Sequence, residues 1–179
     1  MATDMFVGAY WSQRRESREN AANRISRFLQ RVSCSEPEMA RWFLKGRTRA
    51  AAVVPLGLSP AEIAPKLRVN RRDVGGSVIN ELGFGCRIWN GIDTSFAATI
   101  GAFSAAVSNS AVLSLSKPLQ ARKREYWRDL LDAFIEEFDP DHAVVTDFDV
   151  LRSANAQEPW QAGLFTFERG GAPMVHQIL

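Results

Sequence analysis

The densest group of side chains that could do chemistry lies late in the chain and consists of Asp139, Asp141, His142, Asp147 and Asp149. Carboxylates together with an imidazole are typical ligands for Mg²⁺ or Mn²⁺, and such an ion can support hydrolysis. However, Asp139-Pro140-Asp141 is also a typical helix stop, because proline cannot continue a helix. The helix stop is the simpler interpretation. A carboxylate-metal hydrolase that uses Asp139, Asp141 and His142 remains the alternative.

Motifs of better-known catalytic sites are absent from the sequence. There is no Gly-x-Ser-x-Gly elbow, no phosphate-binding loop and no His-Glu-x-x-His zinc helix. Gly83-Phe84-Gly85 lacks the third glycine and the following helix of a dinucleotide site, so a bent strand explains it better. We therefore predict a protein without a cofactor, a resident metal or catalytic residues.

Charge is unevenly distributed along the chain, although the formal net charge is only +2. Residues 12–31 contain six arginines and two glutamates. The region 125–149 reverses this balance, with Arg128 set against Glu125, Asp129, Asp132, Glu136, Glu137, Asp139, Asp141, Asp147 and Asp149. Such asymmetry can steer a partner, although solvated helix faces give the same pattern. A small nucleic-acid-binding module is a further alternative on charge alone, since no RNA- or DNA-binding motif is present.

The cysteines and the apolar segments indicate a protein of the cytoplasm. Cys34 and Cys86 fit no metal or redox spacing, and we expect two reduced, buried thiols. The N-terminus lacks the basic start and apolar stretch of a signal peptide. The uncharged segment 94–116 is long enough to span a bilayer, but its many serine and threonine residues make it too polar. We therefore expect no membrane partner.

The elements that position these residues begin with a strand at Phe6–Trp11 and a helix capped by Ser17. One face of that helix is apolar and comprises Ala21, Ala22, Ile25, Phe28, Leu29 and Val32. A short helix is predicted after Pro37, because Met39, Trp42 and Phe43 recur at helical spacing, with Gly46 ending it. Ser59 with Glu62 predicts a second capped helix.

The second half of the chain predicts a sheet covered by a long helix. Strands are expected at 83–89, 96–106 and 111–116, with Asn90-Gly91 as a two-residue hairpin turn between the first two. The long helix has an apolar stripe of Leu119, Trp127, Leu130, Leu131, Phe134, Ile135 and Phe138. Further strands follow at 143–146 and 160–168. The predicted fold is α+β, an antiparallel meander packed against the N-terminal helix and the long acidic helix.

Several of these residues, taken in order, resemble the immunity protein 52 family, which comprises bacterial antidotes to polymorphic toxins. The matching positions are Gly8, Ala9, Tyr10, Trp11, Arg15, Glu16, Ser17, Trp42, Gly46, Gly83, Phe84, Trp89, Asn90, Gly91, Gly101, Asn109, Leu113, Phe138, Asp139, Pro140 and Asp141. Each of these residues has a structural explanation of its own. It is their joint order along the chain that is specific to the family. The resemblance covers about residues 6–163, whereas similar proteins usually continue with more strand-rich sequence. We therefore expect an immunity-type domain over 1–163 and a tail, 164–179, that a truncation or frameshift would explain.

The resemblance implies a binding protein and not an enzyme. Its partner would be a cognate toxin, a nuclease of the restriction-endonuclease fold delivered between bacteria by contact-dependent or type VI secretion. We expect no direct contact with nucleic acid. We expect the toxin to meet the acidic residues Glu125, Asp129, Asp132, Glu136, Glu137, Asp139 and Asp141, which would occlude a basic cleft. The arginine-rich segment 13–31 is the alternative contact, facing an acidic catalytic pocket.

Overall fold

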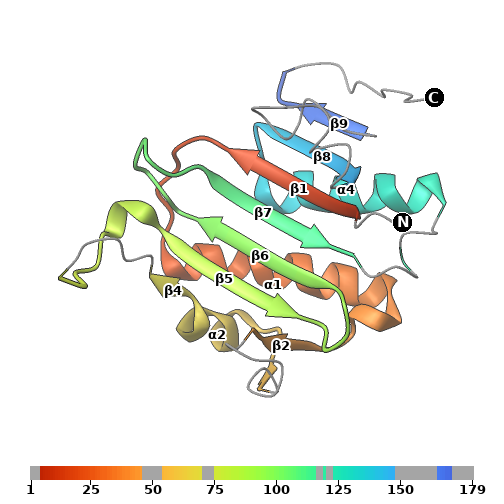
Figure 1. Cartoon of the computed structure of the whole chain (residues 1–179), viewed down its shortest axis with the longest axis horizontal. Helices are drawn as coiled ribbons and strands as arrows, with labels where there is room; N and C mark the ends of the chain where they lie inside the picture. The colour runs from red at the N-terminus through yellow and green to blue at the C-terminus, as the bar shows by residue number, and fades with distance from the viewer. Residues whose placement is uncertain are drawn as a thin grey trace.

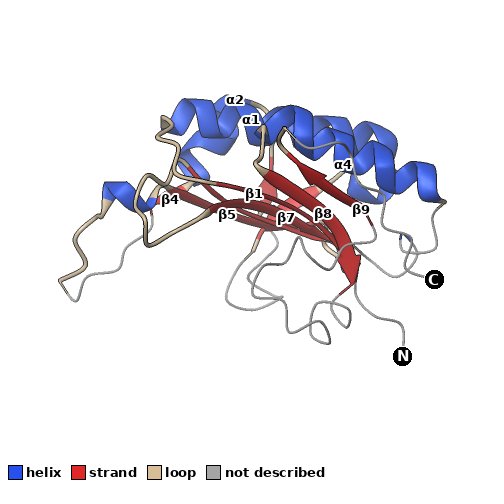
Figure 2. Cartoon of the chain, turned by 90° about the horizontal axis from the view of Figure 1, so that it is seen from above, coloured by secondary structure: helices blue, strands red, loops and turns tan. Residues whose placement is uncertain are grey.

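The computed structural model describes residues 5–45, 54–69, 75–115, 119, 123–147 and 165–170. Its strands are β1 (Met5–Trp11), β2 (Trp42–Leu44), β3 (Pro55–Leu56), β4 (Arg68–Val69), β5 (Phe84–Trp89), β6 (Ser95–Ile100), β7 (Asn109–Ser114), β8 (His142–Asp147) and β9 (Phe165–Glu168). Its α-helices are α1 (Arg18–Ser35), α2 (Pro60–Ile63) and α4 (Arg124–Phe138). These strands form one antiparallel sheet, and the helices pack on one of its faces (Figures 1 and 2). The predicted α+β class is confirmed.

The first strand of the chain lies inside the sheet. The sheet order is β3-β2-β5-β6-β7-β1-β8-β9, and β4 also pairs with β5. β1 is therefore hydrogen-bonded to β7 on one side and to β8 on the other, with Gly8 opposite Val112 and Val144. The predicted three-stranded meander is confirmed as β5-β6-β7, and β9 extends the sheet to Glu168 through its pairing with β8.

The N-terminal helix follows the sequence prediction closely. Ser17 caps α1, because its side-chain oxygen accepts a hydrogen bond from the backbone N–H of Asn20 at 3.1 Å. The predicted apolar face is buried along its whole length, and Phe28 at its centre is fully buried. The second predicted cap is also confirmed, since Ser59 and Glu62 form a complete capping box at the start of α2.

The predicted helix after Pro37 is wrong beyond its first turn. Pro37–Met39 form a single 3-10 turn, and Trp42–Leu44 form strand β2. Leu44 pairs with Ile88 of β5, so backbone bonding to the sheet edge overrides the helical spacing of the apolar side chains. Trp42 is buried, and its indole N–H donates to the Ser33 hydroxyl at 3.3 Å. Gly46, the predicted helix end, lies outside the described residues.

The predicted two-residue hairpin turn is a five-residue loop, because Trp89 pairs with Ser95. Asn90 closes this loop: its side-chain oxygen accepts hydrogen bonds from the N–H groups of Ile92 and Thr94, both at 3.0 Å. Gly91 within the loop has a φ of +87°, which glycine adopts without strain.

Two predicted element boundaries also change. The expected strand 96–106 ends at Ile100, because Gly101 turns the chain with a φ of +80°. The long helix begins at Arg124, so Leu119 is buried outside α4 and is not part of its stripe. Among the residues that the structure places, no helix combines the length and hydropathy needed to cross a bilayer.

The two cysteines differ in exposure, contrary to the prediction that both are buried. Cys34 is exposed, whereas Cys86 is buried and its burial raises the pKa of the thiol to about 12. Since the thiolate is the reactive form, we expect a disulfide reagent at pH 8 to label Cys34 within minutes and Cys86 only after unfolding. Thiol counting in buffer and in denaturant checks this. Rapid labelling of both in buffer would contradict the packing around Cys86.

Candidate functional site

The two long helices lie side by side on the sheet and share an aromatic core. The ring of Phe28 in α1 lies 4.5 Å from Phe134 and 5.3 Å from Phe138 in α4, measured between centroids. Phe138 also stacks on Trp11 of β1 at 5.8 Å. Clusters of this kind are stabilised by area burial and by favourable ring geometry. The relative position of α1 and α4 is therefore fixed by rigid side chains from both helices and from β1.

Ion pairs bridge the two helices above this core. Arg31 pairs with Glu136, and the Nε of Arg27 lies 2.6 Å from a carboxylate oxygen of Glu137. Arg24 donates to the backbone oxygen of Glu137 at 2.7 Å. The basic and acidic segments that the sequence separates by about a hundred positions therefore neutralise one another in part. These contacts form a helix seam between α1 and α4. The seam holds Glu136 and Glu137, both of which were expected at the toxin contact.

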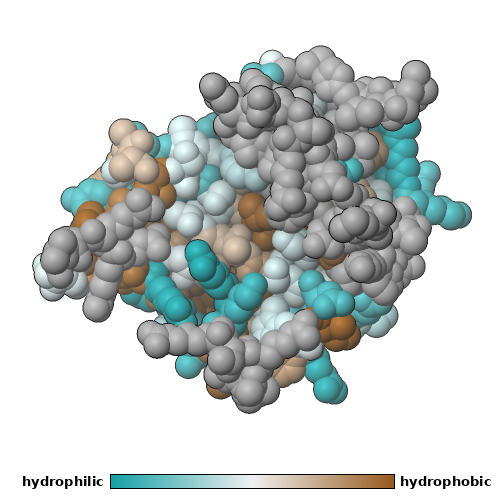
Figure 3. Space-filling view, in the orientation of Figure 1, coloured by the Kyte–Doolittle hydropathy of each residue, from teal (hydrophilic) through white to brown (hydrophobic). Residues whose placement is uncertain are grey.

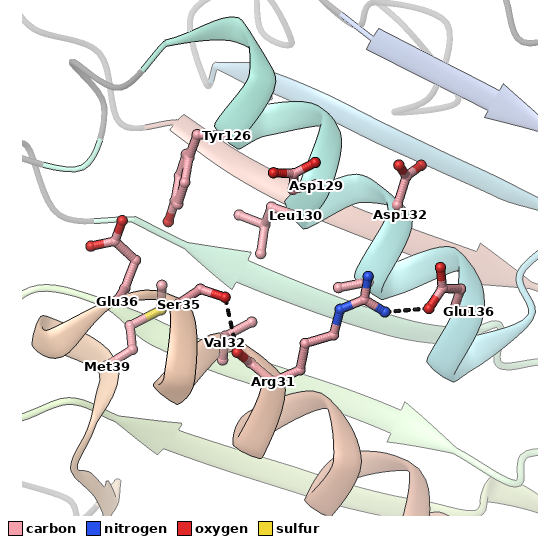
Figure 4. A pocket seen from close by; sticks show the side chains of 11 residues that line it. Arg31, Val32, Ser35, Glu36, Met39, Tyr126, Asp129, Leu130, Asp132 and Glu136 are labelled. Atoms are coloured by element: carbon pink, nitrogen blue, oxygen red, sulfur yellow. Dashed lines mark hydrogen bonds and ion pairs between the residues drawn. The ribbon is translucent and has the colours of Figure 1, made fainter.

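A groove of about 300 Å³ lies between α1 and α4 (Figure 4). Its apolar lining includes Val32, Met39, Leu130 and Ala133. The charged groups around it are Arg31, Glu36, Asp129, Asp132 and Glu136, so acids outnumber bases. Figure 4 shows Arg31 reaching across the groove to Glu136, while Asp129 and Asp132 project from α4 without a drawn partner. The groove is a surface with an apolar floor and an acidic rim.

Three of the predicted contact residues stay exposed and form no ion pair among the described residues. Glu125, Asp129 and Asp132 share one exposed face of α4, at which Asp129 and Asp132 also border the groove. Exposed Arg128 lies on the same face of the helix, but three acids against one base leave a net negative charge, which can attract an oppositely charged surface. The acidic face formed by Glu125, Asp129 and Asp132 is therefore the strongest candidate for an electrostatic contact.

The last two predicted contact residues lie beyond the C-terminal end of α4 and are held by arginines. Asp139 ends the helix in the left-handed conformation, with a φ of +47°. Its carboxylate oxygens lie 2.7 Å from Arg169 and 3.5 Å from Arg14. Asp141 accepts a hydrogen bond from the backbone N–H of Ser12 at 2.7 Å and pairs with Arg169 at 3.3 Å. This cluster ties the end of α4 to β1 and β9.

The positions of Asp139, Asp141 and His142 can be compared with the alternative of a carboxylate-metal hydrolase. Asp139 and Asp141 direct their carboxylates at arginines, and His142 lies opposite Tyr10 in the pairing of β8 with β1. Among the described residues, no group of three or more His, Cys, Asp or Glu side chains could hold a metal ion. Asp149 lies outside the described residues, and Asp147 is half-buried at the end of β8. The described geometry gives this alternative no support.

Asp141 makes a testable contribution to stability. Partial burial alone would raise the pKa of its carboxyl, but the hydrogen bonds from Ser12 and the positive charge of Arg169 outweigh burial and lower the pKa. A lowered folded-state pKa stabilises the fold above the unfolded-state value of about 3.9, and that stabilisation is lost as pH falls through the folded-state pKa. We expect Asp141→Asn to be less stable than wild type at pH 7, with the difference shrinking below pH 4.

Urea unfolding of both proteins at pH 7 and at pH 3 measures this difference. Asp132→Asn is the matched control, because its exposed carboxylate makes no ion pair among the described residues, and it should change stability at neither pH. A difference between wild type and Asp141→Asn that is unchanged at pH 3 would show that the charge of Asp141 is not the cause.

Most residues of the family pattern lie in the sheet or at the junction of β1 and α1. The side chain of Glu16 is buried there between two arginines, with its oxygens 2.8 Å from Arg14 Nε and 2.8 Å from Arg24 Nε. Asn109 is fully buried and bonds the backbone N–H and oxygen of Ala102, at 2.8 and 2.9 Å, and the oxygen of Ser12, at 2.8 Å. These contacts fix the chain as it leaves β1 and enters α1.

The other residues of the pattern also have contacts within the fold. A Cβ at Gly8 would lie 2.8 Å from the hydroxyl of Tyr10, so that ring lies over the glycine. The guanidinium carbon of Arg18 lies over the ring of Phe84, 5.0 Å from the ring centroid. Trp89 pairs with Phe43 of β2, and Pro140 is buried after the helix stop. Sequence reasoning could not find the Arg14–Glu16–Arg24 cluster, because charge pairs have no periodic signature.

Comparison with known protein families identifies the family of this chain. The sequence model of the family described as immunity protein 52 (Imm52) matches residues 3–167. No curated protein sequence matches the chain. The molecule is thus an immunity protein of a polymorphic toxin system, a class whose members bind cognate toxins. The chain belongs to the immunity protein 52 family.

Proposed function

We propose that the protein neutralises a nuclease toxin by covering its DNA-binding cleft with the acidic face of α4. A cleft that holds DNA must present positive charge to the phosphates. Asp129 and Asp132, exposed and without an ion pair among the described residues, carry this proposal, because they offer the complementary charge. Glu125 extends the same face by one helical turn. The apolar floor of the neighbouring groove provides area that a partner side chain can bury.

The alternative contact, the arginine-rich segment 13–31, is less favourable because the fold already uses five of its six arginines in ion pairs or hydrogen bonds. Arg14, Arg24, Arg27 and Arg31 are engaged in ion pairs within the chain. Arg18 donates to the oxygens of Ala64 and Leu67. Binding through these groups would first require breaking contacts that stabilise the domain. The acidic face of α4 needs no such rearrangement.

The toxin would act in the cytoplasm of a neighbouring cell after type VI or contact-dependent delivery, and the immunity protein would meet it there. The test is co-expression with the toxin encoded by the adjacent gene, followed by growth and recovery of the complex. We expect the immunity protein to restore growth, to co-purify with the toxin and to protect the DNA of the expressing cell from cleavage. Toxicity that persists despite soluble, folded immunity protein would contradict the proposal. Rescue from a toxin that cuts no nucleic acid would contradict the proposal that the toxin is a nuclease.

A further inference from the structure

A second charged site lies at the opposite end of the sheet from α4 (Figures 1 and 2). On its outer side β5 has two different partners: β2 pairs with it at Ile88, and β4 pairs with it at Gly85. Cys86 and Arg87 lie between these pairings, and a pocket of about 240 Å³ opens there. Pockets for drug-sized ligands typically measure about 300–1,000 Å³. This one therefore suits a smaller ligand.

Positive charge dominates this pocket. It is lined by Leu44, Lys45, Lys66, Arg68, Val69, Gly85, Cys86 and Arg87, and thus by no carboxylate of the described residues. The four basic side chains are exposed, and none of them forms an ion pair or side-chain hydrogen bond within the described part of the chain. Hydrophilic side chains project over β5 on the face of the sheet that the helices leave open (Figure 3). Four like charges around one cavity repel each other, and a bound anion would relieve that repulsion.

Hydrogen bonds to the backbone fix the segments that carry these cations. The N–H of Lys45 donates to the backbone oxygen of Arg87 at 3.1 Å, which joins the end of β2 to β5. Arg18 donates to the oxygens of Ala64 and Leu67 at 3.1 and 2.6 Å, and so anchors the turn that leads into β4. The thiol of Cys86 stays neutral at physiological pH, because burial raises its pKa to about 12. It therefore adds no competing negative charge.

We propose that this pocket binds a small, multiply charged anion of the phosphate class. Two arginines can each form paired hydrogen bonds with phosphate oxygens, and two lysines supply further point charges. A monovalent anion would leave most of the positive charge uncompensated, so a di- or triphosphate group is the better match. The site is separate from the α4 face, and its test does not depend on the identity of the toxin.

Thermal unfolding of the full-length protein with pyrophosphate tests this proposal, using sodium chloride at matched ionic strength as the reference. We expect Tm to rise by roughly 5–10 °C at about 100 times the Kd, and calorimetric titration to give one site per chain. Replacing Arg68 and Arg87 with glutamine should abolish the Tm shift. The double variant Lys45→Gln with Lys66→Gln should weaken the affinity for pyrophosphate at least tenfold. All four are exposed, so the variants should fold as wild type.

Arg41→Gln with Arg128→Gln is the matched control, since both arginines are exposed, lie outside the pocket and form no ion pair among the described residues. This control should keep the full shift. No shift of the wild-type protein beyond the sodium chloride reference would overturn the proposal. An equal shift in the Arg68 and Arg87 double variant would overturn it as well, as would binding of a short DNA duplex without binding of pyrophosphate.

Discussion

Replacing Gly83 with alanine is expected to lower the free energy of unfolding by about 3–5 kcal/mol, a large part of the stability of a domain this size. Gly83 has a φ of +68° and a ψ of −153°, a conformation that is essentially restricted to glycine. A Cβ there would lie 2.5 Å from both the backbone nitrogen of Ala102 and the backbone oxygen of Ile100. Backbone atoms cannot move aside as a flexible side chain does, so the start of β5 and the end of β6 must separate. Urea unfolding followed by circular dichroism measures the loss.

Gly76→Ala is the matched control for this prediction. Gly76 has a similar φ of +71°, but a Cβ there would meet nothing within 4 Å. Its substitution should therefore cost only the conformational strain, about 1 kcal/mol. Equal losses for the two variants would show that the contact of Gly83 with β6 is not what requires glycine.

Reversing two charges on α4 is expected to slow toxin binding strongly. Asp129→Lys with Asp132→Lys replaces the exposed acids with bases and turns attraction into repulsion. We expect the association rate constant with the cognate toxin to fall at least about tenfold at low salt, because steering acts on the encounter before contact. The difference from wild type should shrink as salt rises, since screening shortens the range of the field. Stopped-flow or surface-plasmon measurements at several ionic strengths measure both effects.

Glu81→Lys with Glu168→Lys gives the same change in net charge at two exposed positions outside α4. This control should bind the toxin nearly as fast as wild type. If both double variants slow association equally, net charge governs the encounter and the α4 face has no special role.

Local signals predicted the central part of the fold. The aromatic and β-branched run at Phe6–Trp11, the cap at Ser17 and the stop at Asp139-Pro140 each depend on neighbouring residues, and each is confirmed. The meander was predictable because its strands follow one another along the chain. The strand at Trp42–Leu44 was not, since its conformation depends on pairing with β5, more than forty residues away.

The candidate sites show the same division between local and distant information. Sequence alone located the acids of α4, but it could not separate Asp129 and Asp132 from Glu136 and Glu137. That separation depends on which acids face arginines of α1 across the helix seam. The basic pocket was hidden for the same reason, because Lys45, Lys66 and Arg87 converge only when β2 and β4 pair with β5.

Titrating the purified protein against the nuclease activity of its adjacent toxin tests the central claim most directly. We expect DNA cleavage to fall linearly with added protein and to end at one immunity protein per toxin, with both proteins recovered unaltered as a complex. Full nuclease activity at saturating immunity protein, or inhibition by far less than one equivalent through turnover, would contradict it.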